Sequence, residues 1–174
     1  MADLPECLEP ARHRDLRGRQ TEVWVRRTVV ALLAAIIVLA LANLFGQRPS
    51  DESAAAPGAS LTVHAPARLR DGLLFQARFT IVATQEIGRP TLVLDPGWFD
   101  RITLNTVVPE PKTEVSSNKR VELTYDPLAP GRRMVVVLSL QINPPGGGFR
   151  DQGVDLRDGE RLLVRIPRTV TVFP

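Results

Sequence analysis

The side chains able to perform acid–base, nucleophilic or metal chemistry are few and scattered in this chain. Its 174 residues include one cysteine, Cys7, and two histidines, His13 and His64. A single cysteine forms no intramolecular disulfide, and these three residues lack the spacing of zinc ligands. No serine lies in a Gly-x-Ser-x-Gly turn, so we interpret His64 as an ordinary strand-end residue. The sequence therefore predicts no catalytic residue, no metal and no cofactor.

Four acidic residues lie close together in the last quarter of the sequence, and they raise the question of a calcium site. They are Asp151, Asp155, Asp158 and Glu160. Their spacing matches no calcium-binding loop, arginines alternate with them, and Asp158 with Gly159 is typical of a hairpin turn. We therefore do not expect these carboxylates to form a calcium site.

Three aromatic residues are the candidates for partner binding. Trp98 and Phe99 directly follow the turn Asp95-Pro96-Gly97, where loops are usually polar. They form either an exposed anchor for a partner or a plug that closes one end of the domain, and we favour the plug for Trp98. Phe149 lies in the connection Asn143–Gly153, whose prolines and glycines suit either a binding loop or a mobile spacer.

The composition indicates a folded protein with no preference for nucleic acid. Apolar residues make up 44% and charged residues 24% of the chain, which is ordinary for globular proteins. The net charge of +3 is too small for the basic patch that nucleic-acid binding requires.

The segment 28–47 is predicted to be a transmembrane helix. It has twenty uncharged residues between Arg27 and Arg48, and such a helix spans about 30 Å. A buried helix of a soluble domain is one alternative. Another is a signal peptide that is cleaved after Ala42, because Ala40-Leu41-Ala42 has the small-x-small form of a cleavage site.

The arginine distribution predicts the orientation in the membrane. Six arginines precede the apolar segment and only Arg48 follows it closely, which places residues 1–27 in the cytosol as a disordered tail. Residues 48–60, rich in Ser, Ala, Pro and Gly, are expected to form a linker. Residues 61–174 are expected to form an extracytoplasmic domain that the helix attaches to the cell membrane.

Residues 61–174 have the pattern of an all-β domain, with short alternating segments separated by Pro, Gly and Asp. The predicted strands are 61–65, 73–83, 90–94, 101–108, 120–125, 134–142 and 161–173, the last with a break at Pro167. Leu138 lies in the strand that we expect to be central. The fold class is therefore all-β, a seven-stranded immunoglobulin-like or fibronectin-type sandwich preceded by one transmembrane helix.

The layout resembles a family of uncharacterised single-pass membrane proteins of high-GC Gram-positive bacteria that carry an outer immunoglobulin-like domain. The segments that support this resemblance are Asp95-Pro96-Gly97-Trp98 and the C-terminal 168–174, RTVTVFP. The resemblance is one of layout and implies no activity. The cysteine pair of antibody domains is absent, since the chain has one cysteine.

These features together predict a non-enzymatic, membrane-anchored module that binds or scaffolds another membrane or envelope protein. One alternative is a domain that binds or senses an envelope polymer, which exposed Trp98 and Phe149 in one groove would favour. An enzyme of unknown type is a further alternative, which a pocket that joins His64 to two acidic residues would favour.

Overall fold

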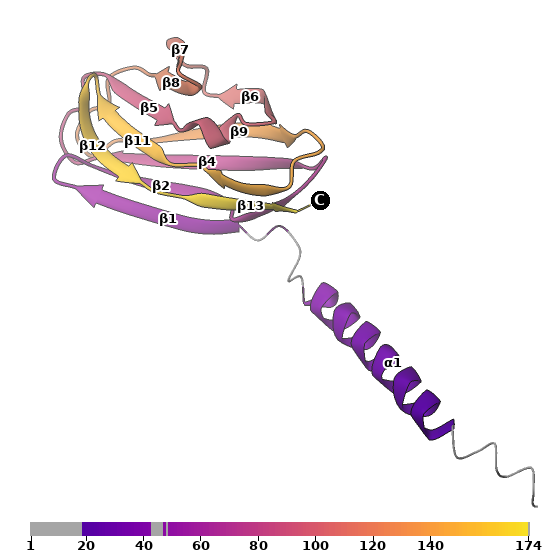
Figure 1. The fold of residues 1–174 in the computed structure, drawn as a ribbon. Coiled ribbons are helices and arrows are strands. Elements are labelled where there is room, and N and C mark those ends of the chain that lie inside the picture. Colours follow the sequence, from indigo (N-terminus) through magenta and orange to yellow (C-terminus); the bar gives the residue numbers. More distant parts are fainter. Residues whose placement is uncertain (1–18, 43–46, 48, 174) are drawn as a thin grey trace, which may run out of the picture. The chain divides into compact units, whose positions relative to one another are not determined.

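The computed structural model describes residues 19–42, 47 and 49–173. The chain divides into two compact units, residues 1–45 and residues 46–174. The first unit contains one helix and the second contains all thirteen described strands (Figure 1).

Helix α1, Arg19–Leu41, carries its charged residues before Thr28 and is apolar on all sides from there to Leu41. Its stretch Thr21–Leu41 is long and apolar enough to cross a membrane, with a mean hydropathy of 2.1 and none of that stretch buried. The helix begins at Arg19 rather than at Thr28, because residues 19–27 contain no proline or glycine to interrupt the backbone hydrogen bonds. Residues 1–18 of the predicted tail and residues 43–46 lie outside the described part of the chain.

The segment 48–60, expected to be a linker, instead contains a strand. Strand β1, Pro49–Ala56, pairs with strand β2, Ala59–Pro66, along its whole length. The side chains of β1 lack apolar alternation, so the sequence pattern gave no sign of it. Its backbone groups are satisfied by the neighbouring strand, and alternate side chains such as Glu52 are partly buried.

The first sheet has the strand order β1-β2-β4-β9-β6, and all its neighbouring strands are antiparallel. Its other members are β4, Leu74–Ala83; β9, Arg133–Ile142; and β6, Ile102–Val108. Strand β4 is the middle one. Strand β9, expected to be central, lies one place from the middle, between β4 and β6.

The second sheet has the order β12-β11-β5-β8-β7 and is also antiparallel. Its strands are β12, Arg161–Ile166; β11, Val154–Asp158; β5, Pro90–Leu94; β8, Arg120–Thr124; and β7, Thr113–Ser117. Strand β12 also contacts β1 and β2, so the two sheets approach each other on that side.

A third, small sheet has the order β10-β13-β3. It consists of β10, Gly148–Asp151; β13, Thr169–Phe173; and β3, Arg68–Arg70, with β13 and β3 parallel. The break at Pro167 is confirmed, since it separates β12 from β13. The described residues form thirteen strands and the prediction of seven was wrong, because β1, β3, β7, β10 and β11 are short or lack apolar alternation.

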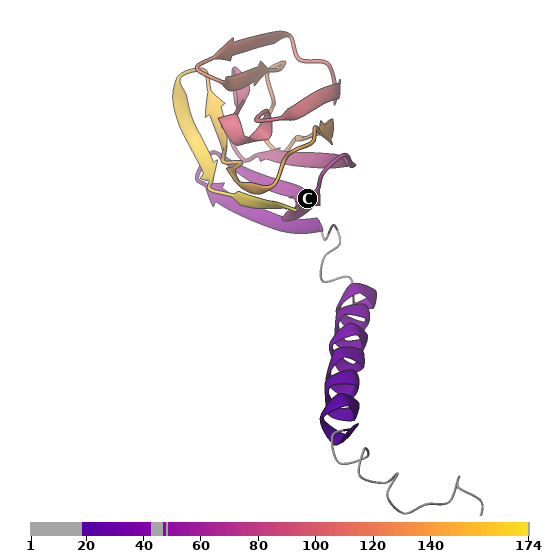
Figure 2. The same cartoon turned by 45° about the vertical axis from the view of Figure 1, so that its right-hand side comes forward.

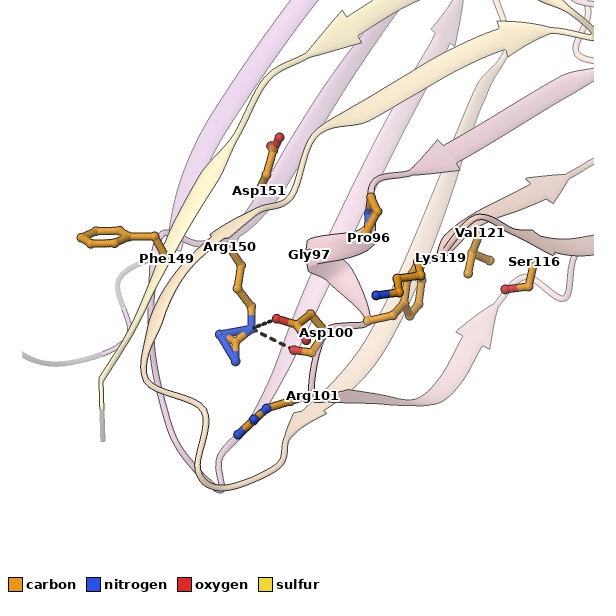
Figure 3. A pocket seen from close by; sticks show the side chains of 11 residues that line it. Pro96, Gly97, Asp100, Arg101, Ser116, Lys119, Val121, Phe149, Arg150 and Asp151 are labelled. Atoms are coloured by element: carbon orange, nitrogen blue, oxygen red, sulfur yellow. Dashed lines mark hydrogen bonds and ion pairs between the residues drawn. The ribbon is translucent and has the colours of Figure 1, made fainter.

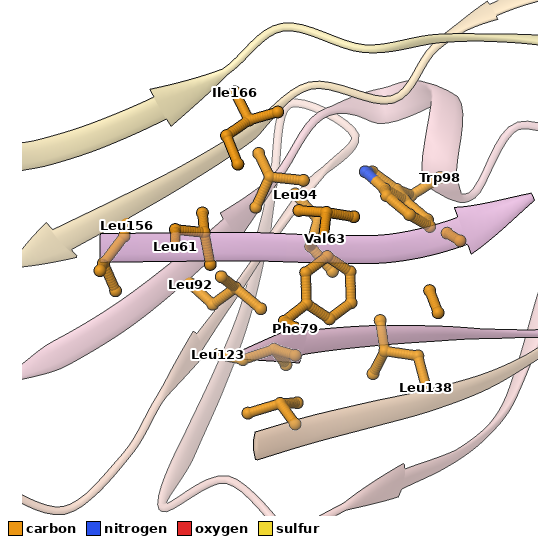
Figure 4. Packing of buried hydrophobic residues seen from close by; sticks show 14 of the residues in the cluster. Leu61, Val63, Phe79, Leu92, Leu94, Trp98, Leu123, Leu138, Leu156 and Ile166 are labelled. Carbon is orange, nitrogen blue, oxygen red and sulfur yellow. The ribbon is translucent and has the colours of Figure 1, made fainter. Parts of the chain in front are cut away.

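The core lies between the first and second sheets, which form a sandwich (Figures 1 and 2). Figure 4 shows its centre, where side chains of β2, β4 and β9 meet those of β5, β8, β11 and β12. Alternate residues of β9 point inward, so Leu138 is fully buried while Val135 is 37% exposed. The all-β sandwich predicted from the sequence is confirmed, with one apolar helix before it.

Candidate functional site

Trp98 is fully buried and closes one end of the sandwich. It lies in the short 3-10 helix η3, Pro96–Trp98, and its ring packs edge-to-face on Phe79, with the centroids 5.4 Å apart. Its indole nitrogen donates a hydrogen bond to the carbonyl oxygen of Gly153 at 3.3 Å. Trp98 is therefore a plug, as favoured above, and its inclusion among the candidate partner-binding residues was wrong.

Gly97 explains the close fit of η3. A Cβ atom at this position would lie 2.1 Å from the carbonyl oxygen of Asp151, so no larger residue is accommodated without a shift of β10. The turn that looked like a surface loop in the sequence is thus packed against another strand.

A buried arginine, Arg168, holds the Trp98 end together. Its guanidinium donates hydrogen bonds to Glu52 at 3.2 Å, to Gln152 at 2.8 Å and to the carbonyl oxygen of Ala65 at 2.9 Å. Burial lowers the pKa of Arg168, and the Glu52 carboxylate acts against that change. These contacts connect β1, β2 and the segment before β13, so they are structural.

Beside this plug lies an open cleft of about 730 Å³ (Figure 3). Its walls come from η3 and the segment 99–101 that follows it, from the hairpin of β7 and β8, and from β10. The lining residues are Pro96, Gly97, Phe99, Asp100, Arg101, Ser116, Lys119, Val121, Phe149, Arg150 and Asp151. Phe99 is partly buried and packs on the core, so it gives this cleft an apolar wall.

Two of the cationic residues of the cleft, Arg150 and Arg101, stabilise its walls by hydrogen bonds to backbone carbonyl groups. Arg150 is buried and donates hydrogen bonds to the carbonyl oxygens of Asp100 and Gly146, both at 2.8 Å. Arg101 donates to the carbonyl oxygen of Pro145 at 2.5 Å. The connection 143–153 is therefore pinned by hydrogen bonds from both arginines, and the expectation of a mobile spacer is not supported.

Lys119 lies at the rim of the cleft, in the turn that joins β7 to β8. It and Asn118 both have positive φ angles, 63° and 50°, as a two-residue hairpin turn requires. Asn adopts this conformation more readily than most residues. Asn118 is therefore the one signal in the sequence that could have indicated the hairpin. Lys119 offers a cation to a polar ligand, and Ser116 beside it offers a hydroxyl group.

Strand β7 forms the outer wall of the cleft and is an open edge. Among the described strands it pairs only with β8, and all five of its residues are exposed. Ser116 pairs with Val121, which places both on the cleft side, whereas Val115 pairs with Glu122 on the outer side. The free backbone groups of β7 therefore run alongside the cleft.

Phe149 is 80% exposed, and its ring points away from the other residues that line the cleft (Figure 3). Its neighbour Arg150 is buried, as alternation along β10 requires. Phe149 thus belongs to the outer face of the small sheet. The three aromatic candidates do not gather in one groove.

Three of the remaining chemistry-bearing residues, His64, Asp155 and Asp158, form pairs, whereas Cys7 and His13 lie outside the described residues. His64 Nδ1 lies 2.5 Å from Asp51 Oδ1 across β2 and β1, in an exposed position. Asp155 binds Arg165 at 3.0 Å, and Asp158 lies 3.5 Å from Arg161. Within the described residues, no three His, Cys, Asp or Glu side chains gather as metal ligands would.

No family model matches the chain, and no curated protein matches it either. Solved structures with similar folds include a non-cellulosomal cohesin from the hyperthermophilic archaeon Archaeoglobus fulgidus, at 10% identity and a TM-score of 0.39. The match covers 66% of this chain and 91% of that one. The CARDB domain of a Pyrococcus furiosus protein, solved with di-metal ions, matches at 11% identity and a TM-score of 0.42, over 69% and 93% of the two chains. At these TM-scores and identities, the similarity assigns neither a family nor a ligand to this chain.

Proposed function

We propose that this protein is a non-enzymatic, membrane-anchored module whose extracytoplasmic sandwich binds another membrane or envelope protein. Helix α1 is the anchor, since its length and composition suit a membrane span. The arginine-rich segment before the span keeps the N-terminus in the cytosol.

The observation that carries the binding role is the open edge of β7 beside the cleft. An extended segment of a partner adds to such an edge by backbone hydrogen bonds, and its alternate side chains enter the cleft. Phe99 then contacts an apolar side chain, while Lys119 and Ser116 contact a polar or acidic one. Because all five residues of β7 are exposed, this strand is free to serve recognition.

The polymer-binding alternative receives less support from the structure. Exposed Trp98 and Phe149 in one groove would favour it, but Trp98 is buried and Phe149 points away from the cleft. The enzyme alternative requires His64 beside two acidic residues, and among the described residues Asp51 is the one acidic side chain that contacts His64.

Site-specific photo-crosslinking in intact cells tests the proposed site. A crosslinking side chain at Ser116 should give a discrete adduct, and the same group at Leu162 should give none. Leu162 is a matched control, because it is 51% exposed and lies on β12, the edge strand at the far side of the second sheet.

A second variant connects the adduct to the edge of β7. Val115→Lys places a charge on the exposed outer side of β7, where it opposes strand addition without disturbing the core. It should abolish the Ser116 adduct. Equal adducts at Ser116 and Leu162, or an adduct that Val115→Lys leaves unchanged, would contradict binding at this edge.

The anchoring is tested separately. The full chain should stay in membranes washed with alkaline carbonate, and protease added to intact protoplasts should digest residues 48–174. A mature protein that begins at Asn43 would show that the helix is a cleaved signal peptide.

A further inference from the structure

The free edge of β7 has a definite pattern of backbone groups. Residues 118 and 119 form the turn of its hairpin with β8, and Ser117 pairs with Arg120 directly across that turn. In a two-residue hairpin the residues that flank the turn exchange both backbone hydrogen bonds, and bonded pairs alternate with non-bonded pairs along the strands. Ser117 and every second residue before it therefore direct their backbone groups toward β8. Glu114 and Ser116 direct theirs to the free edge.

The side chains of β7 divide between the two faces of the sheet. Glu114 and Ser116 lie on the inner face, since the residues that pair with them on β8 are buried. Val115, at the centre of the strand, lies on the outer face and is 47% exposed although it is apolar. Thr113 and Ser117 lie on that same outer face, two residues to either side of Val115. The strand therefore presents an apolar centre between two hydroxyl side chains.

Glu114 restricts which strand can be added at this edge. A charged side chain that points inward from an edge strand opposes the addition of another strand, unless the new strand offers a group that can bind the charge. Like charges directly opposite each other in an antiparallel pair are destabilising, whereas a hydroxyl group can donate a hydrogen bond to a carboxylate. A partner strand must therefore place a hydroxyl or a cationic group opposite Glu114.

A second copy of β7 meets this requirement. When two β7 strands run antiparallel about a two-fold axis at Val115, Glu114 of each copy faces Ser116 of the other copy. The free backbone groups of Glu114 and Ser116 then form the bonded pairs, and Val115 faces Val115 in a non-bonded pair, where side chains lie closest together. Ser116 and Lys119 line the same cleft, so each carboxylate meets a hydroxyl group with a cation nearby. The strand is thus complementary to itself in backbone and side chains.

We propose that the partner at the β7 edge is a second copy of this chain, paired in this register so that the second sheets of the two copies form one continuous antiparallel sheet. The inference rests on the proposed binding role of this edge and names its partner, which is then itself a protein of the same membrane. An edge of five residues buries less surface than a standard interface of about 1,600 Å². Two copies anchored in one membrane have a high effective concentration, so a weak contact suffices.

Disulfide formation at residue 115 in membranes tests this pairing. The full chain carries Cys7→Ser and Val115→Cys and is oxidised in membranes of the cells that express it. The Cα atoms of a non-bonded antiparallel pair lie about 4.5 Å apart, which a disulfide can bridge, so this variant should form a covalent dimer. The matched control is Thr113→Cys, on the same face of the same strand. Its two copies would lie four residues out of register, about 14 Å apart, and should form no dimer.

Further variants test which residues face each other. Chains with Thr113→Cys and chains with Ser117→Cys should form a disulfide when expressed together, because residue 113 of one copy faces residue 117 of the other. Ser116→Glu in the Val115→Cys chain places two carboxylates opposite each other and should lower the dimer fraction several-fold. Adding Glu114→Ser should restore the dimer, since each inner pair again consists of one carboxylate and one hydroxyl group.

The outcomes separate this inference from the binding role itself. A Ser116 adduct with a different protein, without a disulfide at residue 115, refutes the second copy and leaves binding at the β7 edge intact. The absence of both the adduct and the disulfide refutes both proposals. Equal dimer fractions for Val115→Cys and Thr113→Cys would indicate random collision in the membrane and overturn the pairing, as would a dimer that Ser116→Glu leaves unchanged.

Discussion

The guanidinium group of Arg168 lies over the indole ring of Trp98, with its Cζ atom 5.6 Å from the ring centroid. Both side chains are buried, at 3% and 0% exposure. A cation over the face of an indole is attracted by the ring quadrupole, and the attraction is strongest where water is excluded. The pair therefore stabilises the closed end of the sandwich, beside which the cleft lies.

Trp98→Ala should lower the free energy of unfolding by about 3 to 5 kcal/mol, because it leaves a large cavity under η3. In a Trp24→Phe background Trp98 is the only tryptophan of the chain, so its fluorescence reports this site alone. The emission should be blue-shifted and resistant to iodide. Phe149→Ala is the control and should change stability by less than about 0.5 kcal/mol. Strong iodide quenching would contradict the buried position.

Glu52→Ala should destabilise the domain by about 1 to 3 kcal/mol, because it removes a hydrogen bond and the counter-charge from buried Arg168. The control is Asp51→Ala, one residue earlier on the same strand. Asp51 and its partner His64 are largely exposed, so the loss should stay below about 1 kcal/mol. Chemical denaturation of both variants measures the difference, and equal losses would show that the Arg168 contacts contribute little.

Leu138→Ala should cost about 2 to 5 kcal/mol, the range for a large core side chain replaced by a small one. Val135→Ala, on the outward side of the same strand, should cost less than about 1 kcal/mol, because Val135 is 37% exposed. Thermal and urea unfolding test the pair. A small loss of stability in Leu138→Ala would contradict the position of β9 in the core.

Tyr125 should make stability fall at alkaline pH. Burial, with the Glu114 carboxylate adding to it, raises the pKa of Tyr125 above its ordinary value. In the unfolded chain the phenol ionises near pH 10, whereas in the folded chain it keeps its proton. Its contribution to stability is therefore present below about pH 10 and is lost as the pH rises further.

The measurement for Tyr125 is direct, because it is the only tyrosine of the chain. Phenolate absorbance should appear at higher pH in the folded protein than in urea. Tyr125→Phe should reduce the alkaline loss of stability relative to the unmodified chain. Phenolate absorbance at the same pH in folded and unfolded protein would contradict the raised pKa.

The candidate site was only partly predictable from the sequence. Phe99 and Phe149 were named for their unusual positions in loops, and both line the cleft, although Phe149 points away from it. Ser116 and Lys119 were missed, because β7 has no apolar alternation and its hairpin uses Asn118-Lys119 rather than Asn-Gly. Nothing local in the sequence indicates that this hairpin lies opposite η3.

The apolar helix and the all-β character of the domain could both be predicted from the amino-acid sequence. Both follow from local patterns, a continuous apolar run in α1 and a period of two in strands such as β4 and β9. The pairing of β1 and the burial of Trp98 depend on the tertiary structure. The polar segment 49–56 became β1 because β2 offered an unpaired edge, and Trp98 became a plug because Arg168, seventy residues later, lies over its ring. Such outcomes depend on contacts between distant residues, and the local pattern of either partner does not encode them.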